Sequence, residues 1–270
     1  MNRTLAINTL RKEPAQAGAV RAGEMLTQAD EDYLKTIYEL SQERKGRQPV
    51  TTQAIAERLN VQPASVTNMI KKLAQLRLLE HTPYRGVELT PAGRKAALEV
   101  IRHHRLMELY LSEFLGLSWD KVHEEAERLE HVLSEELEER IAEKLGHPTT
   151  DPHGDPIPTK EGIIHEPPVV RLAELSAGER AIVRRVPDRD PALLRYLGEI
   201  GLVPDTPIEV VQVLPFNGPV VVRVGTQETL QYLGRELAAA VRVEPVSSTS
   251  ESSAREPQAD GASSSAASGG

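Results

Sequence analysis

The segment VHEEAERLEHVL, from Val122 to Leu133, concentrates side chains that can bind a metal ion. A helix turns by about 100° per residue, so four of these side chains would share one stripe of its surface: His123, Glu127, Glu130 and His131. Apolar residues fill the neighbouring stripe, which puts the four at the border of a buried face, where imidazoles and carboxylates are costly unless paired or metal-bound. The spacing therefore indicates a metal site, with a solvated acidic helix as the competing interpretation.

His104 and Glu108 repeat the four-residue spacing on the preceding predicted helix and add a third imidazole. Cysteine is absent from the chain, which excludes thiolate ligands and disulfide bonds alike. Ligand sets of oxygen and nitrogen without sulfur favour Mn²⁺ or Fe²⁺, and other divalent ions (Zn²⁺, Co²⁺, Cd²⁺ and Ni²⁺) could take the same ligands. No role is assigned to the remaining histidines: His81, His103, His147, His153 and His165.

A second group of polar residues is suited to reading DNA. Residues 64–76 predict a helix with one apolar face, and polar side chains near its start could reach base edges in the major groove. Basic residues near its end and in the loop 82–86 would meet phosphates. The predicted contacts with DNA are Gln62, Ser65, Thr67, Asn68, Lys71, Lys72, Tyr84 and Arg85. An ordinary polar helix face is the competing interpretation.

The elements around this reading helix predict a winged helix-turn-helix. Thr27, with Asp30 three residues later, is suited to cap a first helix that continues to Leu40. The elements that follow are helices over 52–59 and 64–76 and a hairpin of strands at 78–81 and 87–89. Residues 44–95 contain ten lysines or arginines against three acidic residues, a balance of +7 that suits a phosphate backbone as partner.

The rest of the chain predicts a helical module, a linker and a small β domain. Helical patterns cover residues 91–115, 119–133 and 134–145. Ten acidic residues against four basic ones between positions 119 and 145 give a balance of −6, which suits cation binding or solubility. The stretch 147–158 is too rich in Pro and Gly for a helix. Alternating patterns at 181–183, 208–213 and 220–224, with a short helix over 191–200, predict a small barrel.

Composition limits the class and location of the protein. No apolar run approaches the roughly 20 residues that a membrane span needs, and residues 1–25 lack an export signal. We therefore expect a soluble, cytoplasmic protein without a membrane partner. The net charge of −8 averages over modules of opposite sign, so it does not exclude a nucleic-acid partner.

Taken together, these motifs resemble the diphtheria toxin repressor family of metal-dependent transcriptional regulators, and within it the manganese-responsive branch. The resemblance covers residues 27–245 and rests on the segments DYLKTIY (32–38), SVT (65–67), YRG (84–86), VH (122–123), EH (130–131) and GDPIP (154–158). It implies a mainly α fold with a smaller β part, composed of a winged helix-turn-helix, a helical dimerisation domain and a C-terminal SH3-like β-barrel. The implied partners are a second copy of the chain, forming a homodimer, and double-stranded operator DNA.

The resemblance and the residue patterns together predict six segments. They are a disordered N-terminus at 1–26, the winged helix-turn-helix at 27–98, the dimerisation and metal-sensing domain at 99–147, a Pro-rich linker at 148–167, an SH3-like (FeoA-like) domain at 168–245 and a disordered tail at 246–270. The implied function is regulation, as a repressor, of metal-ion homeostasis in response to Mn²⁺, with Fe²⁺ as the alternative signal. The implied protein is not an enzyme.

The resemblance also implies two metal sites. The primary site would consist of Asp32, Glu127, Glu130 and His131. The ancillary site would consist of His104, Glu108 and His123, completed from the barrel by Asp188 or Asp190. Iron-responsive members tend to place sulfur where Asp32 and Glu127 stand, so hard oxygen ligands here favour Mn²⁺. The chain departs from the short manganese regulators because Lys35 replaces an acidic ligand and because the barrel is present.

The predicted mechanism couples the two modules through the metal. A metal bound by Asp32 and by the three other primary ligands would select one separation of the two recognition helices of a dimer. A di-metal carboxylate enzyme is disfavoured, because it needs two Glu-x-x-His pairs, whereas Arg128 stands three residues before His131 and Asp120 three before His123. A winged-helix regulator that binds an organic effector remains the second alternative.

Overall fold

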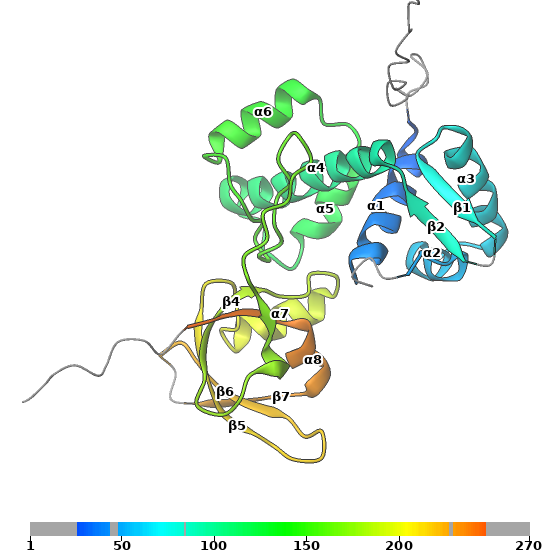
Figure 1. The fold of residues 1–270 in the computed structure, drawn as a ribbon. Helices are drawn as coiled ribbons and strands as arrows, with labels where there is room; N and C mark the ends of the chain where they lie inside the picture. Colours follow the sequence, from blue (N-terminus) through cyan, green and yellow to red (C-terminus); the bar gives the residue numbers. More distant parts are fainter. Residues whose placement is uncertain (1–25, 44–47, 84, 227–228, 247–270) are drawn as a thin grey trace, which may run out of the picture. The chain divides into compact units, whose positions relative to one another are not determined.

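The computed structural model describes residues 26–43, 48–83, 85–226 and 229–246 (Figure 1). The chain divides into two compact units. The first contains the described residues up to Glu166 together with Pro187–Tyr196, and the second contains Pro167–Val186 and the described residues from Leu197 onwards. Of the two ends that were predicted to be disordered, only Leu26 and Val246 are among the described residues. Tyr84 also lies outside the described residues. No helix in the described part of the chain is long and apolar enough to cross a membrane.

The first unit begins with a winged helix-turn-helix, as predicted. Its elements are α1 (Gln28–Glu43), α2 (Thr52–Leu59), α3 (Pro63–Gln75), β1 (Leu79–Thr82) and β2 (Gly86–Leu89). Thr51 caps α2 by accepting a hydrogen bond from the amide of Ala54 at 3.2 Å, and Asn60 ends it with a left-handed backbone (φ 52°). Pro63 then begins α3, whose apolar face packs into the core shared with α1. The hairpin of β1 and β2 lies against α3 (Figure 1).

A helical module follows in the same unit. It consists of α4 (Pro91–Leu115), α5 (Val122–Leu129) and α6 (Glu135–Lys144). Leu106 and Leu111 of α4 pack against Val122 of α5 and Ile141 of α6 in one core. Glu138 of α6 accepts hydrogen bonds from two neighbouring α4 side chains, Arg102 and His103.

The prediction of one helix over residues 119–133 is wrong at both ends. The helix α5 begins only at Val122 and ends at Leu129, so Glu130 and His131 lie in the turn that follows. The backbone tightens there, because the amide of Val132 bonds to the carbonyl of Leu129 three residues back. Ser134 then caps the new helix α6 by accepting from the amide of Leu137 at 3.3 Å.

The second unit is a six-stranded antiparallel sheet with the order β3-β8-β4-β5-β6-β7. Its strands are β3 (Val170–Arg171), β4 (Arg180–Arg185), β5 (Pro207–Val213), β6 (Val220–Val224), β7 (Leu230–Leu233) and β8 (Arg242–Pro245). It also contains the 3-10 helix η1 (Leu172–Glu174) and α8 (Arg235–Ala240). The helix α7 (Pro191–Glu199) begins in the segment that belongs to the first unit and ends in the second. Inward-facing valines such as Val183, Val210 and Val243 are fully buried. The predicted small β domain is confirmed, and it contains three strands that the sequence pattern did not predict.

Candidate metal centre and DNA-reading helix

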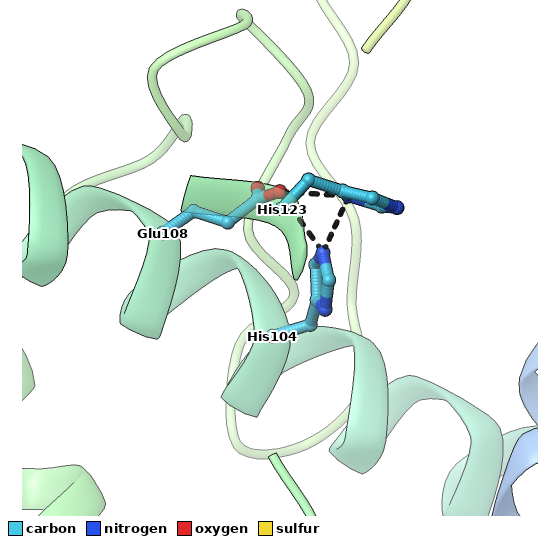
Figure 2. Close-up of side chains that lie close together, drawn as sticks. All are labelled: His104, Glu108 and His123. Carbon is cyan, nitrogen blue, oxygen red and sulfur yellow. Dashed lines mark hydrogen bonds and ion pairs between the residues drawn. The ribbon is translucent and has the colours of Figure 1, made fainter. Parts of the chain in front are cut away.

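The three predicted ancillary ligands converge between α4 and α5, and we call them the α4 cluster (Figure 2). His104 and Glu108 lie one turn apart on α4, and His123 comes from the first turn of α5. Glu108 Oε1 is 2.9 Å from His104 Nε2 and 3.0 Å from His123 Nδ1, and the two nitrogens are 3.1 Å apart. Two imidazole nitrogens and one carboxylate oxygen therefore surround one point, which is a ligand arrangement that fits a divalent cation.

Three of the four predicted primary ligands also meet, and we call them the α1 cluster: Asp32, Glu130 and His131. His131 Nε2 is 2.9 Å from Asp32 Oδ1 and 3.4 Å from Glu130 Oε1. The other ring nitrogen of His131 lies 2.6 Å from the carboxylate of Glu31, a residue that the sequence analysis did not single out. A carboxylate on Nδ1 fixes the ring so that Nε2 faces the other ligands.

Glu127 is not brought into the α1 cluster. Its side chain is 55% exposed, and its carboxylate lies 3.4 Å from the ammonium of Lys35 and 3.8 Å from His123 Nε2. The predicted four-residue primary set thus differs from the three residues that the structure gathers. The ammonium of Lys35 offers an opposite charge to this carboxylate, which is not among the ligand atoms of the α1 cluster.

A buried lysine lies between the two clusters. Lys35 Nζ is 2.8 Å and 2.9 Å from the two carboxylate oxygens of Glu130 and 3.1 Å from His104 Nδ1, and His104 Nδ1 also contacts Glu130. Burial opposes the charge, but Glu130 raises the pKa of Lys35, so the ammonium stays protonated. Burial and Lys35 also oppose protonation of His104, whereas Glu108 and Glu130 raise its pKa to about 9.

A third group, which we call the buried cluster, consists of Glu108, Asp151 and His153. All three are buried, and three of their ligand atoms have no hydrogen-bond partner: Glu108 Oε2, Asp151 Oδ2 and His153 Nδ1. His153 Nε2 donates to the carbonyl oxygen of Trp119 at 2.8 Å, so Nδ1 is the nitrogen that faces Glu108 Oε2, 3.8 Å away. Unpartnered buried oxygens and nitrogen are costly, and a cation would satisfy all three.

Asp151 and His153 were not predicted as ligands from the sequence. Both lie in the segment that was predicted only as a linker, and the Asp-x-His spacing is the signal that could have pointed to them. Among the barrel candidates, Asp190 caps α7 by accepting from the amide of Ala192 at 2.8 Å. Asp188 and Asp190 belong to none of the ligand clusters that the described residues form.

The predicted DNA-reading side chains are exposed on and around α3: Gln62, Ser65, Thr67, Asn68, Lys71 and Lys72, with Arg85 in the loop between β1 and β2. Two of them have partners within the protein. Thr67 donates to the carbonyl oxygen of Pro63 at 3.0 Å, and Lys72 forms an ion pair with Asp30 at 2.7 Å. Tyr84 lies outside the described residues.

A winged helix-turn-helix joined to clusters of buried carboxylates and imidazoles defines a class of protein, the DNA-binding regulators that respond to metal ions. The family models agree in chain order. Residues 25–87 match the iron dependent repressor N-terminal DNA binding domain, residues 90–159 its metal binding and dimerisation domain, and residues 170–245 the FeoA domain.

Relatives match over nearly their whole length. The iron-dependent repressor IdeR of Mycobacterium tuberculosis is 38% identical over 233 residues, which cover 82% of this chain and 99% of the relative. The diphtheria toxin repressor of Corynebacterium efficiens is 36% identical over 236 residues, covering 82% and 97%. A solved manganese-dependent transcriptional repressor in complex with manganese matches with a TM-score of 0.73 at 38% identity, covering 80% of this chain and 100% of the other. The chain belongs to the diphtheria toxin repressor family of metal-dependent transcriptional repressors.

Proposed function

We propose that this protein represses genes of metal-ion homeostasis by binding operator DNA as a homodimer when Mn²⁺ is bound. One observation supports this proposal above the others. Asp32 lies on α1 of the winged helix-turn-helix, whereas Glu130 and His131 lie in the helical module, yet their ligand atoms meet. A cation held by all three would tie the DNA-reading module to the module that matches the dimerisation domain, and so restrict the placement of α3.

The donor set supports Mn²⁺ as the signal. The chain has no cysteine, and the clusters offer carboxylate oxygens and imidazole nitrogens, which are the ligands that Mn²⁺ accepts in proteins. The relatives do not distinguish Mn²⁺ from Fe²⁺, because IdeR is named as iron-dependent and the solved homologue as manganese-dependent. Fe²⁺ is therefore the alternative signal, and Asp32, a hard oxygen ligand, is the residue that favours Mn²⁺.

The α4 cluster and the buried cluster would extend the metal centre. Glu108 belongs to both, because its Oε1 faces His104 and His123 and its Oε2 lies 3.8 Å from His153 Nδ1. Its side chain is fully buried, and an ionised carboxylate there requires cationic partners. We assign Glu108 as the shared ligand, with Asp151 and His153 as ligands on its far side.

Metal-responsive DNA binding can be tested with the full chain and a duplex that the Mn²⁺-loaded protein selects from a random library. Coupling between a metal and DNA of roughly 5- to 150-fold is the usual range for linked sites, so the wild type should bind the duplex tighter by that factor with Mn²⁺. His131→Ala should lose the response. His165→Ala is the matched control, because His165 is exposed and belongs to none of the clusters formed by the described residues.

The same assay ranks the metals. Fe²⁺ under anaerobic conditions and Zn²⁺ are titrated beside Mn²⁺, and free metal concentrations at half-maximal DNA binding are compared. If none of the three ions changes the DNA affinity of the wild type, the proposed function is contradicted. A His131→Ala variant that responds normally contradicts the assignment of the α1 cluster, and a response at lower free Fe²⁺ than Mn²⁺ contradicts the choice of signal.

A further inference from the structure

The first turn of α1 contains a buried carboxylate that binds the reading helix. Asp30 is 1% exposed. Its Oδ2 accepts from the backbone amide of Thr27 at 3.0 Å and from the Thr27 hydroxyl at 2.8 Å. The ammonium of Lys72, on α3, donates to both of its oxygens at 2.8 Å and 2.7 Å. A helix-capping carboxylate would need only Thr27, so the bidentate contact with α3 is an additional constraint.

Lys72 lies on a stripe of α3 that two of the predicted reading residues, Ser65 and Asn68, also occupy. Ser65, Asn68 and Lys72 are spaced i, i+3 and i+7, which places them on one face of the helix, and all three are exposed. The backbone of Lys72 is thus on the DNA-facing stripe, while its ammonium is turned back to Asp30. A lysine that only neutralised phosphate would gain nothing from this buried partner.

Asp30 is also close in the chain to a residue of the α1 cluster. It precedes Asp32 of the α1 cluster by two residues in the same first turns of α1. A cation that restrains Asp32 restrains this turn, and the Asp30–Lys72 pair joins the turn to α3. The hydrogen bonds to Thr27 fix the carboxylate of Asp30, so a displacement of the turn cannot be absorbed by rotation of its side chain.

We propose that Asp30 and Lys72 form a clasp that transmits metal occupancy of the α1 cluster to the recognition helix, with Lys72 acting as a positioning residue rather than as a phosphate contact. This inference rests on the proposed function, because it needs a metal at Asp32. It departs from the sequence prediction, which assigned Lys72 to the DNA phosphates.

The test measures the ratio of duplex affinities with and without Mn²⁺ for full-length wild type, Asp30→Asn, Lys72→Met, the double variant and Lys72→Arg. The duplex is the one selected by the Mn²⁺-loaded wild type. Loss of a hydrogen bond to a charged group should lower the ratio about tenfold in each single variant. The double variant should fall no further, because both substitutions break one clasp. Lys72→Arg should keep most of the ratio, since a guanidinium can bind the same carboxylate through two hydrogen bonds.

Two controls separate the clasp from other roles. Lys71→Met removes a neighbouring exposed lysine and should weaken binding equally with and without Mn²⁺, leaving the ratio unchanged. Glu43→Gln removes exposed ion pairs with Arg58 and Arg189 at the other end of α1 and should change neither affinity. Far-UV circular dichroism checks folding; should Asp30→Asn fail to fold, the Lys72 variants, which alter an exposed residue, decide the question.

Each outcome decides for or against the clasp. If Lys72→Met behaves like Lys71→Met, with an unchanged ratio and a salt slope lower by about one, Lys72 is a phosphate contact and the clasp is refuted. Additive losses in the double variant also refute it. A wild type without any Mn²⁺ response refutes the proposed function, whereas a responsive wild type beside an unaffected Asp30→Asn refutes the clasp alone.

Discussion

Proton competition at His104 should make Mn²⁺ binding to the α4 cluster depend strongly on pH. Burial and Lys35 oppose protonation of this imidazole, but Glu108 and Glu130 raise its pKa to about 9. A metal ligand must be a neutral imidazole, and at pH 7 a group with this pKa is neutral in roughly one molecule in a hundred. Displacing the proton therefore costs about 2.7 kcal/mol at pH 7, two pH units below the pKa at 1.36 kcal/mol each.

The direction of the effect follows from the raised pKa. Below pH 9 the imidazole holds its proton, so Mn²⁺ affinity should rise about tenfold per pH unit from pH 7 and level off above about pH 9. The affinity is measured from the electron paramagnetic resonance signal of free Mn²⁺ under argon, with His131→Ala as background to remove the α1 cluster. Calorimetry in two buffers of different ionisation enthalpy counts the protons released.

A control is needed because a second imidazole beside Glu108, that of His153, also has a raised pKa. Burial opposes its charge, but Glu108 and Asp151 raise the pKa of His153 to about 9. His153→Gln removes this group and should leave the tenfold slope intact if His104 is the proton donor. An affinity that stays flat between about pH 7 and pH 8.5 in that variant, with no proton released per Mn²⁺, would refute the reasoning.

Three further outcomes are expected. Burial raises the pKa of Glu138, but its partners His103 and Arg102 on α4 lower it to about 2. The ionised carboxylate therefore adds about 3 kcal/mol to the free energy of unfolding above the unfolded pKa near 4.5, and this contribution is lost as the pH falls towards 2. Glu138→Gln should flatten that part of an acid-denaturation curve. Gly93→Ala should lower the free energy of unfolding by roughly 3 kcal/mol in urea titrations, because a Cβ would lie 1.8 Å from the carbonyl oxygen of Leu78. Thr67→Ala should relax base preference by roughly 1–3 kcal/mol at one position of the selected duplex, whereas Lys71→Ala should keep the preference and lower the salt slope by about one.

Much of the architecture could be predicted from the sequence, because many of its elements have a period or a cap. Apolar spacing placed α3 with its buried Val66, Ile70 and Leu73, and the wing followed from two short alternating segments. Cap residues mark real boundaries: Thr90 accepts from the amide of Gly93 at 3.1 Å at the start of α4. The i, i+4 spacing related His104 to Glu108, whereas only the family resemblance grouped His123 with them.

The parts that were missed depend on tertiary structure. A uniform helical pattern does not reveal that α5 ends at Leu129, because the end is set by the tightened turn and the new cap at Ser134. Asp151 and His153 lie in irregular backbone, where no period relates them to Glu108. Glu127 has the right helical position, but its carboxylate lies beside Lys35 and His123 and not among the ligand atoms of the α1 cluster.

The two ring nitrogens of His104 connect clusters that the sequence treats as separate. Nε2 faces Glu108 and His123, while Nδ1 faces Glu130 of the α1 cluster. An imidazole that binds a cation through Nε2 retains its proton on Nδ1, where Glu130 accepts it. That hydrogen bond occupies one oxygen of Glu130 and directs the other, which lies 3.4 Å from His131 Nε2, towards the α1 cluster. A cation in the α4 cluster would thereby fix a ligand of the proposed site that includes Asp32, so we expect metal binding at the two proposed sites to be coupled.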